Sequence, residues 1–390
     1  MLNRWGILAI LFIVRAIMAI QYQSVAGLAP LLQRDLGLDL TDVGILIGLY
    51  MAPGMILALP GGAIGRKLGD KTGVLLGLAL MVAGGALMGS TGSWTLQIGG
   101  RLMAGVGGVL LSVLLSNMMA DWFPPEEIGT ATALLMISWP VGLALSLMVV
   151  PEIGASYSAA IANETVSGLA VIGFVLIAAF YHPRASIRKA VARIHLQPNS
   201  AALVVGAAIA YTLYVIGYGM VVNFAPSMLV ERGWSMTEAG ATTSIVIWIG
   251  VASTLVGGAL ADKTGRHNLI SVASYLAFAV LLVMVPRCNS TILAFIALGI
   301  VSGLPIASVA SLPVRMLAPS ARPIGLGLFY TIFYCGMMVG PGLGGRYASW
   351  LGTADAVFDF GAMVVIVGTA MLCVVANLPA MVRSTAEVPS

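Results

Sequence analysis

Charged residues are scarce in this 390-residue chain: Asp, Glu, Lys and Arg make up 9% of it, and apolar types make up 59%. Water-soluble globular proteins carry roughly 25% charged residues. This scarcity excludes a soluble protein of such length and indicates that lipid is the solvent for much of the surface. The sequence pI near 9.0 does not indicate nucleic-acid binding, because the basic residues lie at the ends of apolar runs.

Cysteine is scarce too, and Cys288, Cys335 and Cys373 form no spaced pair. This excludes a disulfide scaffold, a zinc site and a redox motif. The sequence also lacks a nucleophile–base set, a phosphate loop and a cluster of metal ligands, so we expect neither enzymatic activity nor a cofactor. Because no nucleotide-binding domain is present, any transport must be driven by a gradient.

Apolar runs of about twenty residues recur along the chain, each long enough to cross the hydrocarbon core of a bilayer as a helix. Their residues do not alternate between apolar and polar types, which excludes strands of a membrane barrel. The predicted fold class is therefore an all-α membrane protein with twelve transmembrane helices. The predicted spans are 6–31, 43–64, 73–91, 96–120, 128–150, 163–181, 201–226, 240–261, 269–286, 291–314, 324–347 and 357–379.

Twelve spans place both termini on one side of the membrane, and the basic residues outside the spans divide 13 to 4 in favour of that side. By the positive-inside rule, we expect a multi-pass protein of the cytoplasmic (inner) membrane with both termini in the cytoplasm. The predicted organisation is a six-helix half (1–181), a cytoplasmic linker (182–200) and a second six-helix half (201–390). The linker is interpreted as a tether, or alternatively as a lipid-headgroup or regulatory site.

The two halves align without a gap at an offset of 196 residues, which indicates a tandem repeat. The pairs related by this offset include Pro30 with Pro226, Gly37 with Gly233, Thr41 with Thr237, Asp42 with Glu238, Gly44 with Gly240, Gly69 with Gly265 and Gly107 with Gly303. Two parallel repeats related by an axis along the membrane normal are a known plan of transporters, in which the substrate binds near the midplane between the halves. The repeat therefore favours transport by alternating access.

Two motifs make a family resemblance specific. Residues 258–267 (GALADKTGRH) fit a G-x-x-x-D-[RK]-x-G loop followed by basic residues, and residues 101–107 (RLMAGVG) fit R-x-x-x-G-x-G. The chain resembles the major facilitator superfamily over essentially its whole length. Within it, the chain is similar to bacterial cyanate-transporter-like and nitrate/nitrite-porter-like members, although the glycine–asparagine signature of nitrate porters is not found.

The resemblance implies a conformational latch in the loop motif. Asp262 is expected near the start of the helix that begins at Ile128, with Lys263 and Arg266 in reach of Glu126 and Glu127. In the first half Arg66 replaces the acid, and Asp70 is a candidate substitute that would pair with Arg322. Alternatively, these charges only anchor solvated loops.

Two cations lie well inside predicted spans: Arg15 in 6–31 and Arg101 in 96–120. The resemblance implies that the spans 6–31, 96–120, 201–226 and 291–314 line the cavity. Charge inside a bilayer is costly and is functional by default, and no acid stands at mid-span to neutralise either arginine. Both are therefore predicted to bind an anion, for which the guanidinium fork is well suited. The alternatives are a structural bond to a neighbouring helix for Arg101, and snorkelling or carbonyl bonding for Arg15.

Tyrosines are predicted to complete the site. Tyr211, Tyr214 and Tyr218 are spaced for one helix face, as are Arg15 and Tyr22. Phenol hydroxyls would orient an anion. Ordinary helix packing is the alternative reading of the stripe.

The sequence as a whole predicts a secondary transporter of a small organic or inorganic oxyanion. Its expected partners are the solute and the lipid bilayer, with no nucleic acid, and the expected state is a monomer. A proton-coupled drug or metabolite exporter of the same fold is the alternative. A non-transporting membrane sensor has no support in the short tails.

Overall fold

The computed structural model describes residues 3–57, 67–90, 92–183, 198–317 and 321–386, and the elements in these ranges are helical. The first half contains α1 (Arg4–Leu36), α2 (Leu40–Leu49), α3 (Ala52–Leu57), α5 (Asp70–Ser90), α6 (Trp94–Ala120), α7 (Ile128–Ser156) and α8 (Ala159–Phe180). The second half contains α9 (Pro198–Glu231), α10 (Met236–Thr264), α11 (His267–Met284), η1 (Val285–Arg287), α12 (Thr291–Gly303), α13 (Ile306–Ala310), α14 (Leu312–Met316), α15 (Arg322–Leu351) and α16 (Ala356–Ala386).

These elements form twelve spans that are long and apolar enough to cross a membrane, some of them built from more than one element, which confirms the predicted fold class. Several are longer than the apolar run that predicted them. The first continues past Pro30 and through the charged residues Arg34 and Asp35 before it ends at Gly37. Hydropathy marks only the lipid-facing part of a helix, so polar ends that continue the same hydrogen-bonded backbone are missed.

Prolines divide two spans. The second span is split into α2 and α3 around Pro53, and the tenth into α12, α13 and α14 around Pro305 and Pro313. A proline within a helix removes a backbone donor and permits a kink. Pro140 and Pro151 lie inside an unbroken α7, so a proline alone does not divide a span.

The backbone repeats at the offset found in the sequence. Gly37 and Gly233 adopt left-handed φ values of 65° and 85°, and Gly69 and Gly265 adopt 79° and 66°. These conformations favour glycine. Capping boxes also recur at the same offset: Asp39 with Asp42 begins α2, and Ser235 with Glu238 begins α10. The two halves therefore share helix boundaries as well as residues.

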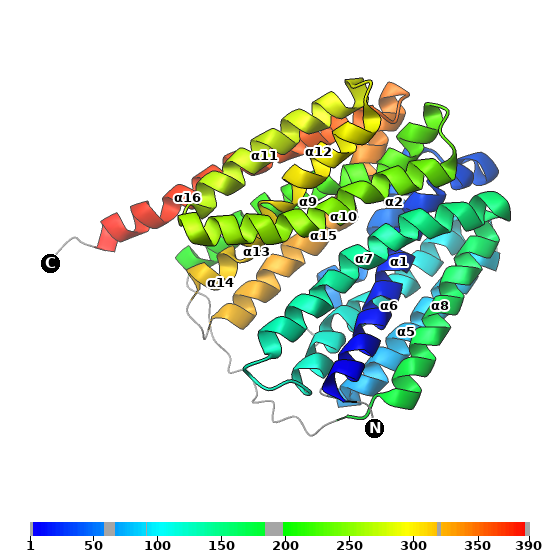
Figure 1. Cartoon of the computed structure of the whole chain (residues 1–390), viewed down its shortest axis with the longest axis horizontal. Coiled ribbons are helices and arrows are strands. Elements are labelled where there is room, and N and C mark those ends of the chain that lie inside the picture. Colours follow the sequence, from blue (N-terminus) through cyan, green and yellow to red (C-terminus); the bar gives the residue numbers. More distant parts are fainter. Residues whose placement is uncertain (1–2, 58–66, 91, 184–197, 318–320, 387–390) are drawn as a thin grey trace.

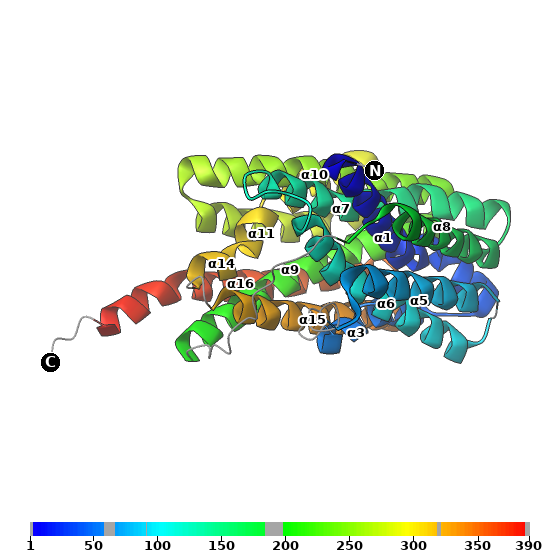
Figure 2. The same cartoon turned by 90° about the horizontal axis from the view of Figure 1, so that it is seen from below.

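The halves form two bundles that meet along a few helices. Between the bundles, α2 packs against α15, α7 against α10, and α1 against α9. Figure 1 shows α1–α8 in one bundle and α9–α16 in the other, diverging toward the side on which both termini lie. Figure 2, turned by 90°, shows α10 beside α7 and α15 near α3 and α6. We call the end with the termini the open end, and the opposite end the closed end. Residues 184–197 of the predicted linker lie outside the described residues.

Candidate substrate site between the two halves

Arg101 is fully buried and holds the first half together. Its Nε donates to the carbonyl of Leu46, and its Nη1 and Nη2 donate to the carbonyls of Gln21 and Tyr22, each at 2.9 Å. The guanidinium also lies 5.0 Å from the centre of the Tyr50 ring. A carbonyl has a second lone pair after its helix bond, so these acceptors are available to it. In this conformation Arg101 joins α6 to α1 and α2 and does not point toward a substrate, which is the structural alternative named for it above.

Arg15 has a different environment. Its Nε and Nη1 are shielded from solvent and have no hydrogen-bond partner among the described residues. Its electrostatic partners are the phenols of Tyr330 and Tyr334, which belong to α15 of the other half. Buried donors of a charged group are costly when they are left unpaired. Arg15 is therefore a cation between the halves with unused donors, which is the chemistry an anion requires.

Tyr330 and Tyr334 were not among the predicted site residues. Tyr330 is 47% exposed, and Tyr334 lies against Gly54 of α3 and interacts with Ser112 of α6. A run of aromatic residues is visible in the sequence at 329–334, which reads FYTIFY. The helix that carries it, α15, is not among the spans that the family resemblance placed around the cavity.

Tyr22 is buried at the first half's contact with α9. Its ring lies 5.5 Å from that of Tyr50 and 5.4 Å from that of Trp139, and its phenol interacts with Asn223 of α9. One residue further, the Gln23 amide donates to the Val222 carbonyl at 2.9 Å. Tyr22 and Gln23 thus belong to the contact between α1 and α9.

The predicted tyrosine stripe is divided. Tyr211 packs on Phe329 and Phe333 of α15, with ring centres 5.4 and 5.7 Å away. Tyr218 is half-buried. Tyr214 is 1% exposed: its hydroxyl donates to the Ser302 carbonyl at 2.7 Å, and its ring stacks on Tyr275 at 4.2 Å.

Tyr214 therefore points into the second half and is not placed with the other two. The physical reason is that its position lies about 60° around the helix from Tyr211, far enough to face a different neighbour.

The closed end is sealed by residues related through the repeat. Thr41 of α2 donates to Ser349 of α15 at 3.2 Å, and Thr237 of α10 donates to the Glu152 carboxylate of α7 at 2.6 Å. Gly44 lies against the Pro341 carbonyl, and its repeat partner Gly240 lies against the Leu147 carbonyl, so that a Cβ on either would collide with the opposite half.

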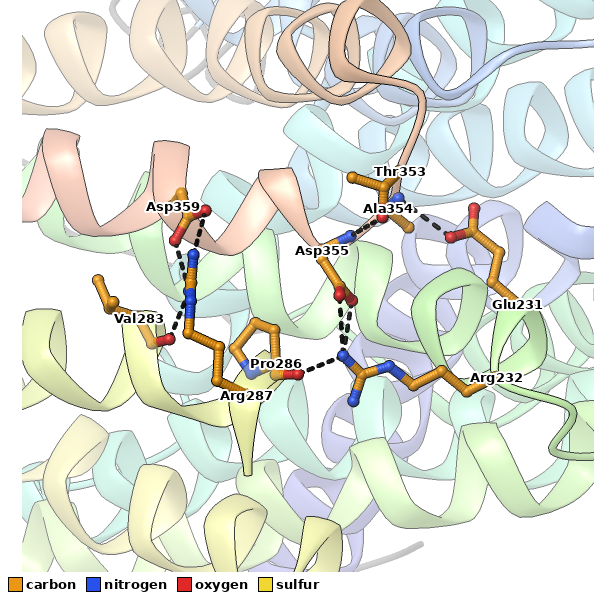
Figure 3. A network of polar contacts seen from close by, with 9 residues as sticks. All are labelled: Glu231, Arg232, Val283, Pro286, Arg287, Thr353, Ala354, Asp355 and Asp359. Atoms are coloured by element: carbon orange, nitrogen blue, oxygen red, sulfur yellow. Dashed lines mark hydrogen bonds and ion pairs between the residues drawn. The ribbon is translucent and has the colours of Figure 1, made fainter. Parts of the chain in front are cut away.

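The second half carries an ionic network at its closed end (Figure 3). Nη2 of Arg232 lies 2.9 Å from both carboxylate oxygens of Asp355, and Arg287 forms two bonds of 2.9 Å with Asp359. Arg232 also donates to the Pro286 carbonyl, and Glu231 accepts from the Ala354 amide at 3.1 Å. The network joins α9, η1 and the start of α16 within one half.

The latch residues lie at the open end and do not make the predicted contact in this conformation. Asp262 is 3.8 Å from His267 and its side chain is 81% exposed, while Glu127 pairs with Arg4 at 2.6 Å. Lys263 and Arg266 are exposed. The expectation that Asp262 lies near the start of α7 is thus not met here, because the bundles diverge at this end.

The first-half counterpart differs from its prediction as well. Arg322 donates from Nε to the Leu317 carbonyl at 3.3 Å within its own half, instead of pairing with Asp70, the first residue of α5. Arg66 lies outside the described residues.

Comparison with known proteins agrees with this architecture. The sequence profile of the Major Facilitator Superfamily matches residues 11–205 and 207–389. The chain is 28% identical to the 3-(3-hydroxy-phenyl)propionate transporter of Escherichia coli over 84% of this chain and 87% of that protein. It is 24% identical to the hexuronate transporter of Bacillus subtilis over 69% and 68% of the two chains, and 23% identical to a multidrug efflux protein of that organism over 88% and 86%.

Solved structures show the same fold. A bacterial homologue of the human lysosomal transporter Spinster, in an inward-facing and occupied conformation, superposes with a TM-score of 0.73 at 15% identity, covering 98% of this chain and 97% of that one. Together with the twelve spans and the repeated half, the profile match over both halves places the chain in a family: it is a multi-pass membrane protein that belongs to the major facilitator superfamily.

Proposed function

We propose that this protein is a secondary transporter of a small anion, whose negative group binds Arg15 between the two halves. The observation that carries the proposal is the pair of buried, unpartnered guanidinium nitrogens of Arg15. An oxyanion would supply an acceptor to Nε or to Nη1, and its second oxygen can accept from Nη2, which forms a fork with each of them. Of the site residues predicted from the sequence, the proposal keeps Arg15, with Tyr211 and Tyr218 at the edge of the site, and it adds Tyr330 and Tyr334.

Alternating access follows from the arrangement of the contacts. Hydrogen bonds and glycine contacts between the halves gather at the closed end, and the bundles diverge at the other. We propose that the termini are cytoplasmic in the inner membrane, as the distribution of basic residues suggests, so that this conformation is inward-facing. A monomer suffices, because one chain supplies both walls of the site.

The alternative of a drug or metabolite exporter draws support from the similarity to a multidrug efflux protein. An unpaired cation in the site disfavours cationic drugs through charge repulsion. The cyanate and nitrate branches remain predictions from the sequence.

The test is a thermal-shift screen of the purified protein against nitrate, cyanate, glucuronate and aryl carboxylates at two pH values. A ligand that binds the folded form raises its melting temperature. The Arg15→Ala variant should lose the shift and the corresponding uptake into proteoliposomes by 100-fold or more, roughly the cost of losing a charge-assisted bidentate pair. Arg15→Lys should recover only part of it, because an ammonium cannot donate in a fork.

Arg34→Ala is the matched control. Arg34 is a cation of the same helix whose side chain is 71% exposed and pairs with Asp35. Its loss should change neither the shift nor uptake. Full uptake by a folded Arg15→Ala protein would refute the proposed site.

We also propose that the latch at Asp262 forms in the opposite conformation, when the open end closes and the carboxylate reaches the start of α7. The Asp262→Asn variant should increase labelling of engineered cysteines at the open end, by a few-fold. Unchanged labelling at both ends would show that these charges only anchor loops.

A further inference from the structure

A wall of aromatic rings stands across from Arg15. Phe329, Tyr330, Phe333 and Tyr334 lie on one side of α15 and contact one another in series, with ring centres 5.6, 6.3 and 5.7 Å apart. Tyr211 of α9 extends the wall by its contacts with Phe329 and Phe333. We refer to these five residues as the aromatic wall.

The aromatic wall and Arg15 lie at a similar depth. Both α1, from Arg4, and α15, from Arg322, begin at the open end. At 1.5 Å per residue, Arg15 lies about 16 Å along its helix and Tyr330 about 12 Å along its own. Tyr334, one helical turn beyond Tyr330, lies against Gly54 of α3, so this side of α15 faces the first half. The electrostatic interaction between Arg15 and Tyr330 agrees with this placement.

Part of the aromatic wall is exposed. Tyr330 is 47% exposed although it lies near a cation of the opposite half, and Phe333 is partly buried beside it. An exposed aromatic residue in such a position offers a flat apolar surface to whatever binds the cation. Offset or edge-to-face contact with another ring contributes about 0.5–1.5 kcal/mol beyond area burial.

We infer that the substrate class is a monocarboxylate with an aromatic body. The carboxylate binds the free donors of Arg15, and the ring packs on the aromatic wall near Tyr330 and Phe333. The inference rests on the proposed function and narrows its anion to one chemical class. The phenol hydroxyls of Tyr330 and Tyr334 can each serve one further polar group on the ring.

The same surroundings are poorly suited to the other anions considered above. A sugar acid brings several hydroxyl groups, each of which loses its hydrogen bonds to water and requires a new partner. Beside the phenol hydroxyls of Tyr330 and Tyr334 the aromatic wall offers only ring faces, which leaves most of these hydroxyl groups without a partner. A small inorganic oxyanion would satisfy Arg15 but would leave the rings of the opposite half without contact.

The experiment is calorimetric titration of the full-length purified protein with four probes: 3-phenylpropionate, 3-phenylpropan-1-ol, glucuronate and nitrate. The first carries charge and ring, the second the ring alone, and the last two charge without an apolar body. We expect 3-phenylpropionate to bind at least 10-fold more tightly than the other three. Phe333→Leu, which removes the ring but keeps an apolar side chain, should weaken its binding roughly 3- to 10-fold.

Trp350→Leu is the matched control. Trp350 is an aromatic residue of the same helix, 77% exposed and outside the wall, so its loss should leave binding unchanged. If glucuronate or nitrate binds more tightly than 3-phenylpropionate and depends on Arg15, the inference is wrong and the proposed function stands. If no probe binds in an Arg15-dependent way, both fail.

Discussion

The two halves of this protein are alike at the closed end, where they meet, and differ at the centre, where we propose that the substrate binds. At the closed end Thr41 and Thr237, and likewise Gly44 and Gly240, make corresponding contacts with the opposite half. At the centre the repeat relates Arg15 to Tyr211 and Arg101 to Ala297. In the proposed site the cation therefore comes from one half and the aromatic wall from the other, which suits a substrate with two chemically different ends.

The halves also differ in how their helices are held together. Arg101 binds three backbone carbonyls in the middle of the first half. The second half has its ion pairs at the closed end, where Arg232 and Arg287 pair with Asp355 and Asp359. The repeat counterparts of these four are Leu36, Thr91, Ala159 and Asn163.

The largest effect is expected for Arg101→Leu, which tests whether an internal arginine stabilises the first half in a way that its counterpart Ala297 does not stabilise the second. The variant loses three charge-assisted bonds, each worth about 1.5–3 kcal/mol, so we expect a loss of roughly 3 kcal/mol or more in the free energy of unfolding. Ala297→Ser at the equivalent position should change it by less than about 1 kcal/mol. Thermal unfolding in detergent measures both. If the Arg101→Leu protein is as stable as the wild type but no longer binds ligand, Arg101 belongs to the substrate site instead.

A smaller effect is expected from enlarging the paired glycines, which tests whether the seal is symmetric. In Gly44→Val and Gly240→Val the new side chain meets the carbonyl of Pro341 or Leu147. Overpacking costs about 1–3 kcal/mol, which should shift the equilibrium roughly 5- to 150-fold away from the sealed state. Labelling of engineered cysteines at the closed end measures the shift.

Gly168→Val is the control for this pair, since a Cβ at Gly168 meets nothing within 4 Å. Both glycine variants should increase labelling, and the control should not. A response from only one of the two would show that one half alone controls closure.

The smallest effect is expected from removing the threonine hydroxyls at the closed end, which tests whether the two halves contribute equally to the seal. Thr41→Val and Thr237→Val each remove one hydrogen bond between the halves, worth about 0.5–1.5 kcal/mol. The loss at Thr237 should be larger, because its acceptor is a carboxylate at 2.6 Å, whereas that of Thr41 is a hydroxyl at 3.2 Å. The same labelling assay measures both, and Thr237→Ser should behave like the wild type. Equal responses would show that the charge of Glu152 contributes nothing to the seal.

Much of the architecture was determined by the sequence alone. The solvent that surrounds a helix selects its composition, so the apolar runs predicted twelve spans. The offset of 196 residues predicted a tandem repeat, and glycines that it relates, such as Gly37 and Gly233, share a left-handed backbone conformation. The two motifs predicted the superfamily. The presence of two cations inside spans was visible as well.

Only the tertiary structure decided what those cations do. Both arginines stand inside apolar spans, but the donors of Arg101 meet carbonyls of α1 and α2, whereas Nε and Nη1 of Arg15 meet no acceptor among the described residues. Tyr214 was separated from Tyr211 by a neighbour, Tyr275, that is distant in sequence. The aromatic wall on α15 belongs to the proposed site because the first half of the chain lies across from it. Helix boundaries follow from local bonds and solvent, but the use of a polar group depends on which partner long-range packing brings to it.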